Sequence, residues 1–147
     1  MSFRTYVIYG LGVCSDQAPQ VTREGVEALL AMAPETAKYV RSHPEYSESD
    51  DHFANLDWYE ADSCCVNGAF ALLSDVLAER EHMIYFTLCD DFDGLQYILY
   101  EPCYPWEVSV RDMSMTPTSI REIFDKYTMV LYGMTLPVVY YECHNGG

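Results

Sequence analysis

Residues 83–100 read MIYFTLCDDFDGLQYILY, and this stretch decides the fold class. Two apolar, aromatic-rich runs, residues 83–89 and 95–100, flank the acidic segment DDFDG at residues 90–94. Asp and Gly are typical turn residues, and Gly supplies the positive φ that tight hairpin loops require. The pattern therefore predicts two antiparallel strands joined by a short acidic loop.

Further strands are predicted near the two ends of the chain. Residues 5–9 are β-branched or aromatic and run into Gly10-Leu11-Gly12, where the strand ends in a turn or passes close to another part of the chain. Residues 136–143 predict a closing strand, and Pro137 places its start at a sheet edge.

Helices are predicted between these strands. Thr22 is a plausible N-cap for a helix with Val26, Leu29, Leu30 and Ala33 at helical spacing, and a second helix runs from Pro34 to Val40. A central helix follows Asp62 or Ser63, and a last one opens at Thr116-Pro117. The expected fold is α+β, with helices packed on an antiparallel sheet of about four strands. Without a repeat or linker, residues 1–147 are expected to form a single acidic domain.

Charge is distributed unevenly along the chain. The formal net charge is -15, and residues 42–110 hold fifteen Asp or Glu against one base, Arg80. Residues 1–41 balance four acids with four bases, and residues 111–147 set four acids against three bases. An acidic surface repels phosphates, so direct nucleic-acid binding is disfavoured. The partner we expect is instead a basic nucleic-acid-binding protein.

Carboxylates spaced over a rigid surface can imitate a nucleic-acid backbone and occupy the basic groove of such a protein. The predicted partner-binding residues are Asp50, Asp51, Asp57, Trp58, Tyr59, Glu60, Asp62, Asp90, Asp91 and Asp93. The aromatic residues among these acids, Trp58, Tyr59 and Phe92, would add apolar anchoring of the kind found at interface hot spots. The alternative interpretation is an acidic surface that only supports solubility.

Metal, cofactor and catalytic signals are weak. The DDFDG segment lacks the later Glu and the ligand spacing of an EF-hand loop, and the six Cys form no two-residue-gapped pair typical of zinc sites. Gly10-Leu11-Gly12 lacks the third glycine of a dinucleotide fingerprint. We therefore expect no metal, no cofactor and no catalytic residues. A small cysteine-based or metal-dependent enzyme, or an acidic oligomeric structural protein, is the alternative.

The first residues carry one base and then a short apolar run broken by Gly10 and Gly12, unlike a signal peptide or a membrane span. We expect a cytoplasmic protein without membrane association, whose six Cys are reduced thiols.

Several short motifs occur in a familiar order. They are YGLGVC at residues 9–14, DDFDG at 90–94, the pair Tyr97 and Tyr100, YPW at 104–106 and NGG at 145–147. On these motifs the chain resembles small acidic proteins of unknown function from bacterial and phage mobile elements. The resemblance implies a genetic setting and supplies no catalytic residue. The predicted function is a non-enzymatic acidic interaction protein, a nucleic-acid-mimicking inhibitor of a host defence protein of the anti-CRISPR or anti-restriction type.

Overall fold

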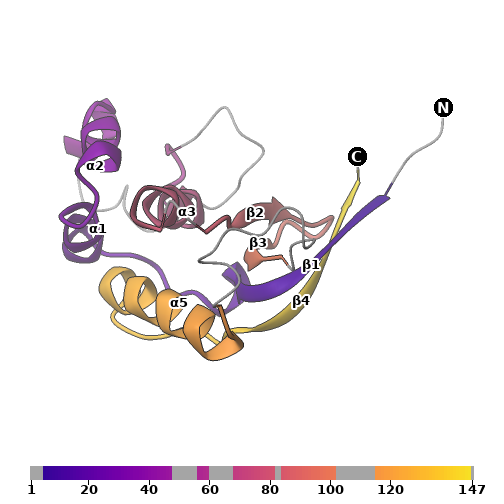
Figure 1. Ribbon diagram of the computed structural model, residues 1–147. Coiled ribbons are helices and arrows are strands. Elements are labelled where there is room, and N and C mark those ends of the chain that lie inside the picture. Colours follow the sequence, from indigo (N-terminus) through magenta and orange to yellow (C-terminus); the bar gives the residue numbers. More distant parts are fainter. Residues whose placement is uncertain (1–4, 48–55, 60–67, 82–83, 102–114, 147) are drawn as a thin grey trace.

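The protein is an antiparallel sheet with helices packed on it, so the predicted α+β class is confirmed. The computed structural model describes residues 5–47, 56–59, 68–81, 84–101 and 115–146. The strands follow the order β2-β3-β1-β4 (Figure 1). Their bounds are β1 (Thr5–Cys14), β2 (Thr87–Asp90), β3 (Gln96–Tyr100) and β4 (Val139–Gly146). β4 lies at one edge, as Pro137 predicts.

The helices form two layers beside the sheet. α3 contacts β2 and β3, and α5 contacts β1, whereas α1 and α2 pack on these two helices at the end of the molecule remote from β4's tip (Figure 1). The helix bounds are α1 (Arg23–Leu30), α2 (Pro34–Arg41), α3 (Gly68–Arg80) and α5 (Pro117–Tyr132). Short 3-10 turns, η1 (Ser15–Gln17) and η2 (Pro44–Ser47), follow β1 and α2.

Local sequence sets the ends of these helices. The Thr22 hydroxyl accepts a hydrogen bond from the Gly25 N–H at 3.1 Å, and the Thr116 hydroxyl accepts one from the Ser119 N–H at 3.1 Å. Each bond satisfies one of the backbone donors that a helix N-terminus leaves without a partner. The cap at Thr22 and the start of the last helix at Thr116-Pro117 agree with the prediction. α5 ends at Gly133, whose φ of 74° is the left-handed conformation that glycine adopts without strain.

β1 is longer than the predicted strand of residues 5–9. It continues through Gly10 and Gly12 to Cys14, because these glycines lie where the backbone of β3 passes close by. A Cβ atom at Gly12 would lie 1.8 Å from the carbonyl oxygen of Ile98. Of the two predicted roles for this segment, close approach is confirmed and a turn is wrong.

Two other strands begin later than predicted. The Ile84 N–H donates to the carbonyl of Glu81 at 2.8 Å, and β2 begins only at Thr87. β4 begins at Val139 rather than at residue 136, after Pro137, which has no N–H to donate. The predicted start of the central helix, after Asp62 or Ser63, and Met83 lie outside the described residues.

Apolar side chains cover both faces of the sheet. The main core joins Leu11, Val13 and Ile98 to the helices, and α3 is its centre, since Phe70, Leu73, Val76 and Leu77 are all buried. On the opposite face lies a smaller group, here called the outer cluster, made of Cys14, Cys89, Tyr97, Leu99 and Cys143.

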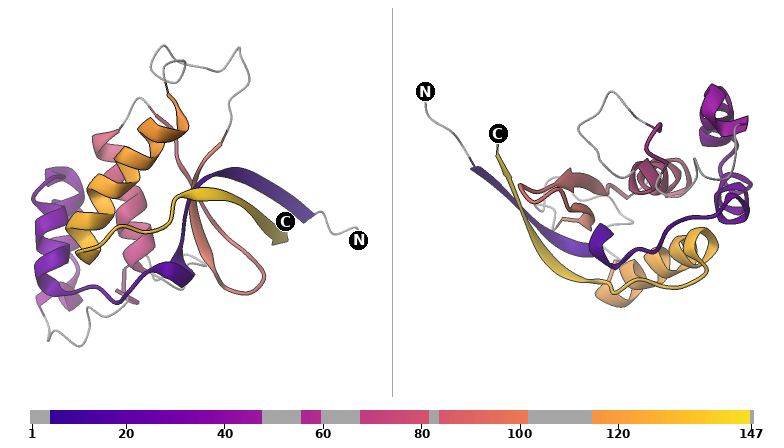
Figure 2. Two further views of the ribbon diagram at one scale, coloured as in Figure 1. Left: turned by 90° about the horizontal axis from the view of Figure 1, so that it is seen from below. Right: turned by 180° about the vertical axis from the view of Figure 1, so that it is seen from behind.

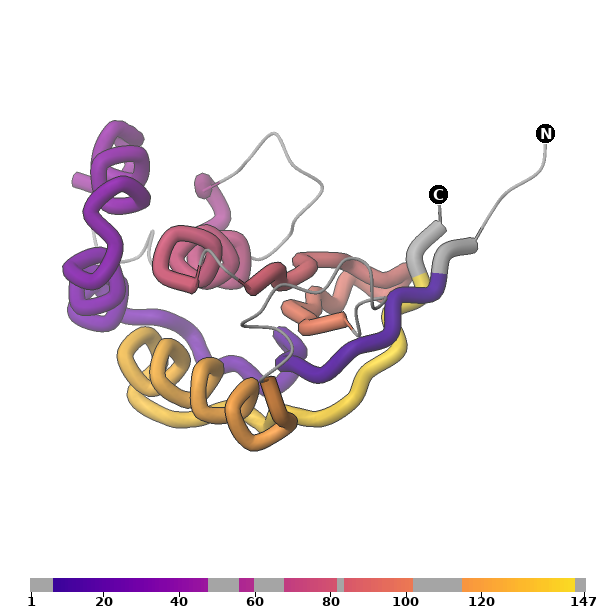
Figure 3. The backbone as a smooth tube through the Cα atoms, in the orientation of Figure 1, coloured from indigo at the N-terminus to yellow at the C-terminus, as the bar shows by residue number. Residues whose placement is uncertain are grey.

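Curvature of the sheet encloses this outer cluster. β1 and β4 run side by side beyond the helices and curve away from them (Figures 2 and 3). β2 and β4, which stand at opposite edges of the sheet, contact each other. The outer cluster is therefore a second small core inside a curled sheet.

Candidate binding surface

An open cavity of about 340 Å³ lies between α2 and α3. We call it the α2–α3 cavity, and its lining residues are Glu35, Thr36, Tyr39, Tyr59, Asp75 and Glu79. Three of the six are acids, two are tyrosines, and no Lys, Arg or His is among these described lining residues. The cavity thus combines negative charge with aromatic surface.

Glu79 is positioned by the start of α2. Its carboxylate accepts hydrogen bonds from the Glu35 N–H at 3.2 Å, the Thr36 N–H at 2.7 Å and the Thr36 hydroxyl at 2.8 Å. The residue before this helix, Ala33, offers no capping side chain, so α3 supplies the cap from outside. Desolvation opposes the charged form of Glu79, but the hydrogen bonds from Thr36 and Glu35 outweigh it and lower the pKa.

Asp75 lies one helical turn before Glu79 and is the most desolvated acid of the cavity. Its carboxylate accepts a hydrogen bond from the Tyr59 hydroxyl. Burial raises the pKa of Asp75, and the bond from Tyr59 opposes that rise only in part. The Asp75 carboxyl group is therefore partly shielded from water, and the donor that the described residues provide to it is the Tyr59 hydroxyl.

Four rings pack together beside the cavity. Tyr39 stands edge-on to His43, with ring centroids 5.0 Å apart, and to Tyr59 at 6.0 Å. Trp58 lies 5.5 Å from His43 and 6.2 Å from Tyr59. The His43 ring is also placed by a 3.0 Å contact between its Nδ1 and the Tyr39 carbonyl. These contacts hold the 56–59 segment against α2.

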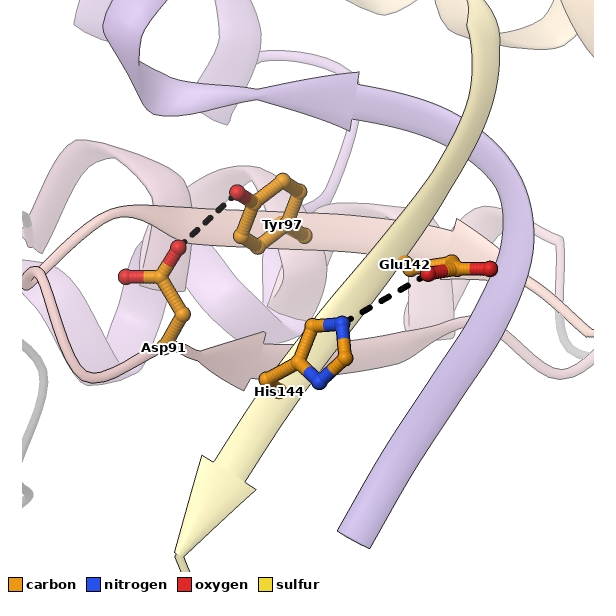
Figure 4. Close-up of polar contacts among 4 residues, drawn as sticks. All are labelled: Asp91, Tyr97, Glu142 and His144. Carbon is orange, nitrogen blue, oxygen red and sulfur yellow. Dashed lines mark hydrogen bonds and ion pairs between the residues drawn. The ribbon is translucent and has the colours of Figure 1, made fainter.

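The acidic turn of the β2–β3 hairpin is built around Asp91. Its Oδ1 accepts hydrogen bonds from the N–H groups of Asp93 at 2.9 Å and Leu95 at 3.0 Å, and its Oδ2 accepts one from the Tyr97 hydroxyl at 2.9 Å (Figure 4). Burial, and then the nearby Asp91 carboxylate, raise the pKa of Tyr97. Gly94, with a φ of 81°, completes the turn as predicted.

A second polar contact in Figure 4 lies on the edge strand. His144 Nε2 and Glu142 Oε2 of β4 are 3.5 Å apart, and both side chains are more than half exposed. An ion pair in such a position contributes little, typically about 0.5 kcal/mol. It does not mark a site by itself.

The described thiols belong to the outer cluster. Cys14, Cys89 and Cys143 are free and buried, and burial raises the pKa of Cys14 to about 11 and that of the other two as well. Thiols with such pKa values carry little thiolate at neutral pH and are poor nucleophiles and metal ligands. Across the described ranges, no group of three or more His, Cys, Asp or Glu is arranged to hold a metal ion.

The predicted partner-binding residues fall into separate groups. Asp57, Trp58 and Tyr59 belong to the 56–59 segment, where Tyr59 contacts Tyr39 of α2 and Asp75 of α3, whereas Asp90, Asp91 and Asp93 lie at the turn between β2 and β3, on another part of the molecule (Figure 1). Asp57 and Asp93 are exposed. The remaining predicted residues, Asp50, Asp51, Glu60 and Asp62, lie outside the described residues.

Two of the predicted contacts differ from what the sequence suggests. Tyr59 is 1% exposed, so its ring belongs to the core and only its hydroxyl reaches the cavity. The Asp91 carboxylate is occupied by hydrogen bonds from backbone N–H groups of the turn itself. Phe92 of the hairpin turn, which was predicted as an aromatic anchor, is 70% exposed, and Tyr39, which was not, is 51% exposed.

Sequence reasoning missed Glu35, Tyr39, Asp75 and Glu79. Glu35 and Tyr39 are four residues apart on one helix, and so are Asp75 and Glu79 on another, so each pair shares a helix face. That spacing is visible in the sequence, but the pairing of the two faces depends on how α2 packs on α3.

Comparisons with known proteins add no assignment: no family model, no curated protein and no solved structure matches this chain. The resemblance to mobile-element proteins therefore stays a prediction. Within the described ranges, no helix has the length and apolar character needed to cross a bilayer.

Proposed function

We propose that this chain is a non-enzymatic acidic interaction protein that inhibits a basic nucleic-acid-binding defence protein by occupying its nucleic-acid groove. The observation that carries the proposal is the concentration of fifteen acids against one base in residues 42–110. A surface of that charge attracts a basic groove and releases its counterions, as a nucleic acid does. A CRISPR effector nuclease or a restriction enzyme is the partner class we propose.

The described acids of that stretch support the proposal, because all of them reach the surface. Nine of the fifteen lie in the described residues, and each is exposed or half-buried. They are Glu45, Asp57, Asp75, Glu79, Glu81, Asp90, Asp91, Asp93 and Glu101. Acids at the surface can act on a partner through long-range attraction.

The mechanism we propose is steric and electrostatic competition. The acidic protein and the nucleic acid would bind the same basic groove, so inhibition would need no chemical step. Such binding weakens as salt screens the charges, over a Debye length that falls to about 8 Å at physiological ionic strength. The cysteine-based alternative gains no support from the described thiols, which are buried with raised pKa values.

The test is competition for labelled DNA, measured by fluorescence anisotropy, with a panel of purified defence nucleases at low and high salt. We expect the protein to displace DNA from at least one nuclease and to lose this ability as salt rises. The test variant changes five acids of the middle stretch to Lys: Asp50, Asp51, Asp57, Glu60 and Asp62. This variant should no longer compete.

A matched control carries the same charge change elsewhere. Its five substitutions to Lys lie outside residues 42–110, at Glu24, Glu27, Glu122, Asp125 and Glu142. The control should keep most of the competition, because the middle stretch remains acidic. If both variants lose competition equally, net charge alone explains the effect. If the variant with Lys at residues 50, 51, 57, 60 and 62 competes as well as the wild type, the proposal is overturned.

A further inference from the structure

The α2–α3 cavity supports an inference about how the partner is recognised. It rests on the proposed function, because it takes the partner to be a basic protein. Of the described bases on the two helices that form the cavity, Arg80 of α3 interacts with one of the three acids, Glu79. Lys38 and Arg41 of α2 line a separate cavity together with Leu30 and Pro34. Arg80 of α3 is hydrogen-bonded to Tyr127 and attracted to Glu81 and Glu79. The described lining of the α2–α3 cavity therefore has three acids and no base of its own.

The acids keep capacity to accept further hydrogen bonds. An ionised carboxylate offers about four lone-pair sites. Asp75 accepts one bond that the structure shows, from Tyr59, and the Glu35 carboxylate accepts none from any described residue. Asp75 is also partly desolvated, which strengthens its interaction with any cation that reaches it.

An aromatic ring stands at the same place. Tyr39 lines the cavity and is half-exposed. Part of its apolar ring surface is therefore in contact with water. The ring is held in position because His43 and Tyr59 both pack edge-on to it, with interplanar angles of 90° and 72°. A fixed, exposed ring beside carboxylates is the arrangement that attracts organic cations.

We propose that the α2–α3 cavity binds the guanidinium group of an arginine side chain presented by the partner protein. The planar guanidinium pairs with carboxylates through two parallel hydrogen bonds and stacks on an aromatic face. In the cavity, Asp75 and Glu35 would accept those bonds and Tyr39 would provide the face. A lysine ammonium is a smaller, more strongly hydrated charge and makes neither the planar pair nor the stack.

The probe that tests this is the blocked tripeptide acetyl-Gly-Arg-Gly-amide, titrated at constant ionic strength and followed by ¹⁵N NMR. We expect saturable shifts of the Glu35, Thr36 and Tyr39 amides, because the first two donate to Glu79 at the cavity wall. The Lys tripeptide should bind more weakly, and the Gln tripeptide should cause no saturable shift. A response to the Lys peptide equal to that of the Arg peptide would overturn the choice of arginine.

Variants distinguish binding in the cavity from general electrostatic attraction to the acidic surface. Tyr39→Leu should weaken binding of the Arg tripeptide by about fivefold, as loss of a cation–π contact of roughly 1 kcal/mol would. Asp75→Asn should weaken it by a similar factor, because the charged acceptor for the guanidinium is lost. Tyr39→Phe keeps the ring and should bind like the wild type. The control is Glu122→Gln, which removes an equal charge from the exposed surface of α5 and should leave affinity within about twofold.

The outcomes for the cavity and for the proposed function are distinct. Shifts scattered over the whole surface, or equal losses in Glu122→Gln and Asp75→Asn, would overturn the cavity as an arginine site. If Tyr39→Leu still displaces DNA from a nuclease as the wild type does, the inhibitor function stands and the cavity plays no part in it. If the Arg tripeptide binds as expected but no nuclease is affected, the proposed function fails alone.

Discussion

At the scale of single residues, the buried amide side chain of Gln96 is unfavourable to the fold. Its side chain is 0% exposed, and neither its amide nitrogen nor its amide oxygen has a hydrogen-bond partner among the described residues. A buried polar group left without a partner costs about 1–3 kcal/mol. The Gln96 backbone is well placed, since its N–H donates to the Ser15 hydroxyl at 2.9 Å.

The substitution Gln96→Met should therefore stabilise the protein. Methionine has a similar length and no amide, so the free energy of unfolding should rise by about 1 kcal/mol. Urea denaturation followed by circular dichroism measures this. Gln96→Glu is the control, and it should lower the free energy of unfolding, because it places a charge at the same buried position. A lower stability for Gln96→Met than for the wild type would mean that the amide is satisfied in solution.

At the scale of elements, the β2–β3 hairpin depends on Asp91 rather than on turn propensity alone. Asp91→Ala removes three acceptor contacts, to the Asp93 and Leu95 N–H groups and to the Tyr97 hydroxyl. Hydrogen bonds to charged groups contribute about 1.5–3 kcal/mol each at most, and their effects overlap within one turn. We expect Asp91→Ala to lower the free energy of unfolding by about 2 kcal/mol.

A neighbouring acid provides the matched comparison for this hairpin prediction. Asp93→Ala removes the same charge from the same turn, but Asp93 is exposed, so its effect should stay within about 0.5 kcal/mol. Both variants are compared by thermal and urea unfolding. If the two changes cost the same, Asp91 acts only as a surface charge and the turn does not need its carboxylate.

Element by element, the sequence predicted well where the signal was local. The cap at Thr22, the helix start at Thr116-Pro117 and the hairpin loop depend on residues within a few positions of one another, and the structure confirms them. The continuation of β1 through Gly12 could not be predicted with certainty. It depends on the carbonyl of Ile98, which is distant in the chain.

The candidate site was harder to predict for the same reason. Charge in the sequence pointed to residues 42–110, and Asp75 and Glu79 lie in that stretch. Glu35 and Tyr39 lie outside it, and they join the α2–α3 cavity only because α2 packs on α3. Composition identifies the acidic region, whereas the concave site within it needs the tertiary contacts.

At the scale of the whole molecule, a formal net charge of -15 on 147 residues should make the fold sensitive to salt. Like charges repel one another more strongly in the compact state than in the unfolded chain. Raising NaCl from about 0.01 M to about 0.15 M shortens the Debye length from about 30 Å to about 8 Å and so screens this repulsion. We expect Tm to rise by about 3 °C, as roughly 1 kcal/mol produces in a domain of this size.

Scanning calorimetry at several salt concentrations measures this dependence, and a charge variant identifies its source. Changing Asp50, Asp51, Asp57, Glu60 and Asp62 to Asn or Gln removes five negative charges from the acidic stretch. That variant should have a higher Tm than the wild type at low salt and a smaller rise with added NaCl, because less repulsion remains to be screened. A wild-type Tm that falls as salt is added would show that attractive pairs dominate the folded state. The acidic stretch would then be balanced internally, and less of its charge would be available to attract a basic partner.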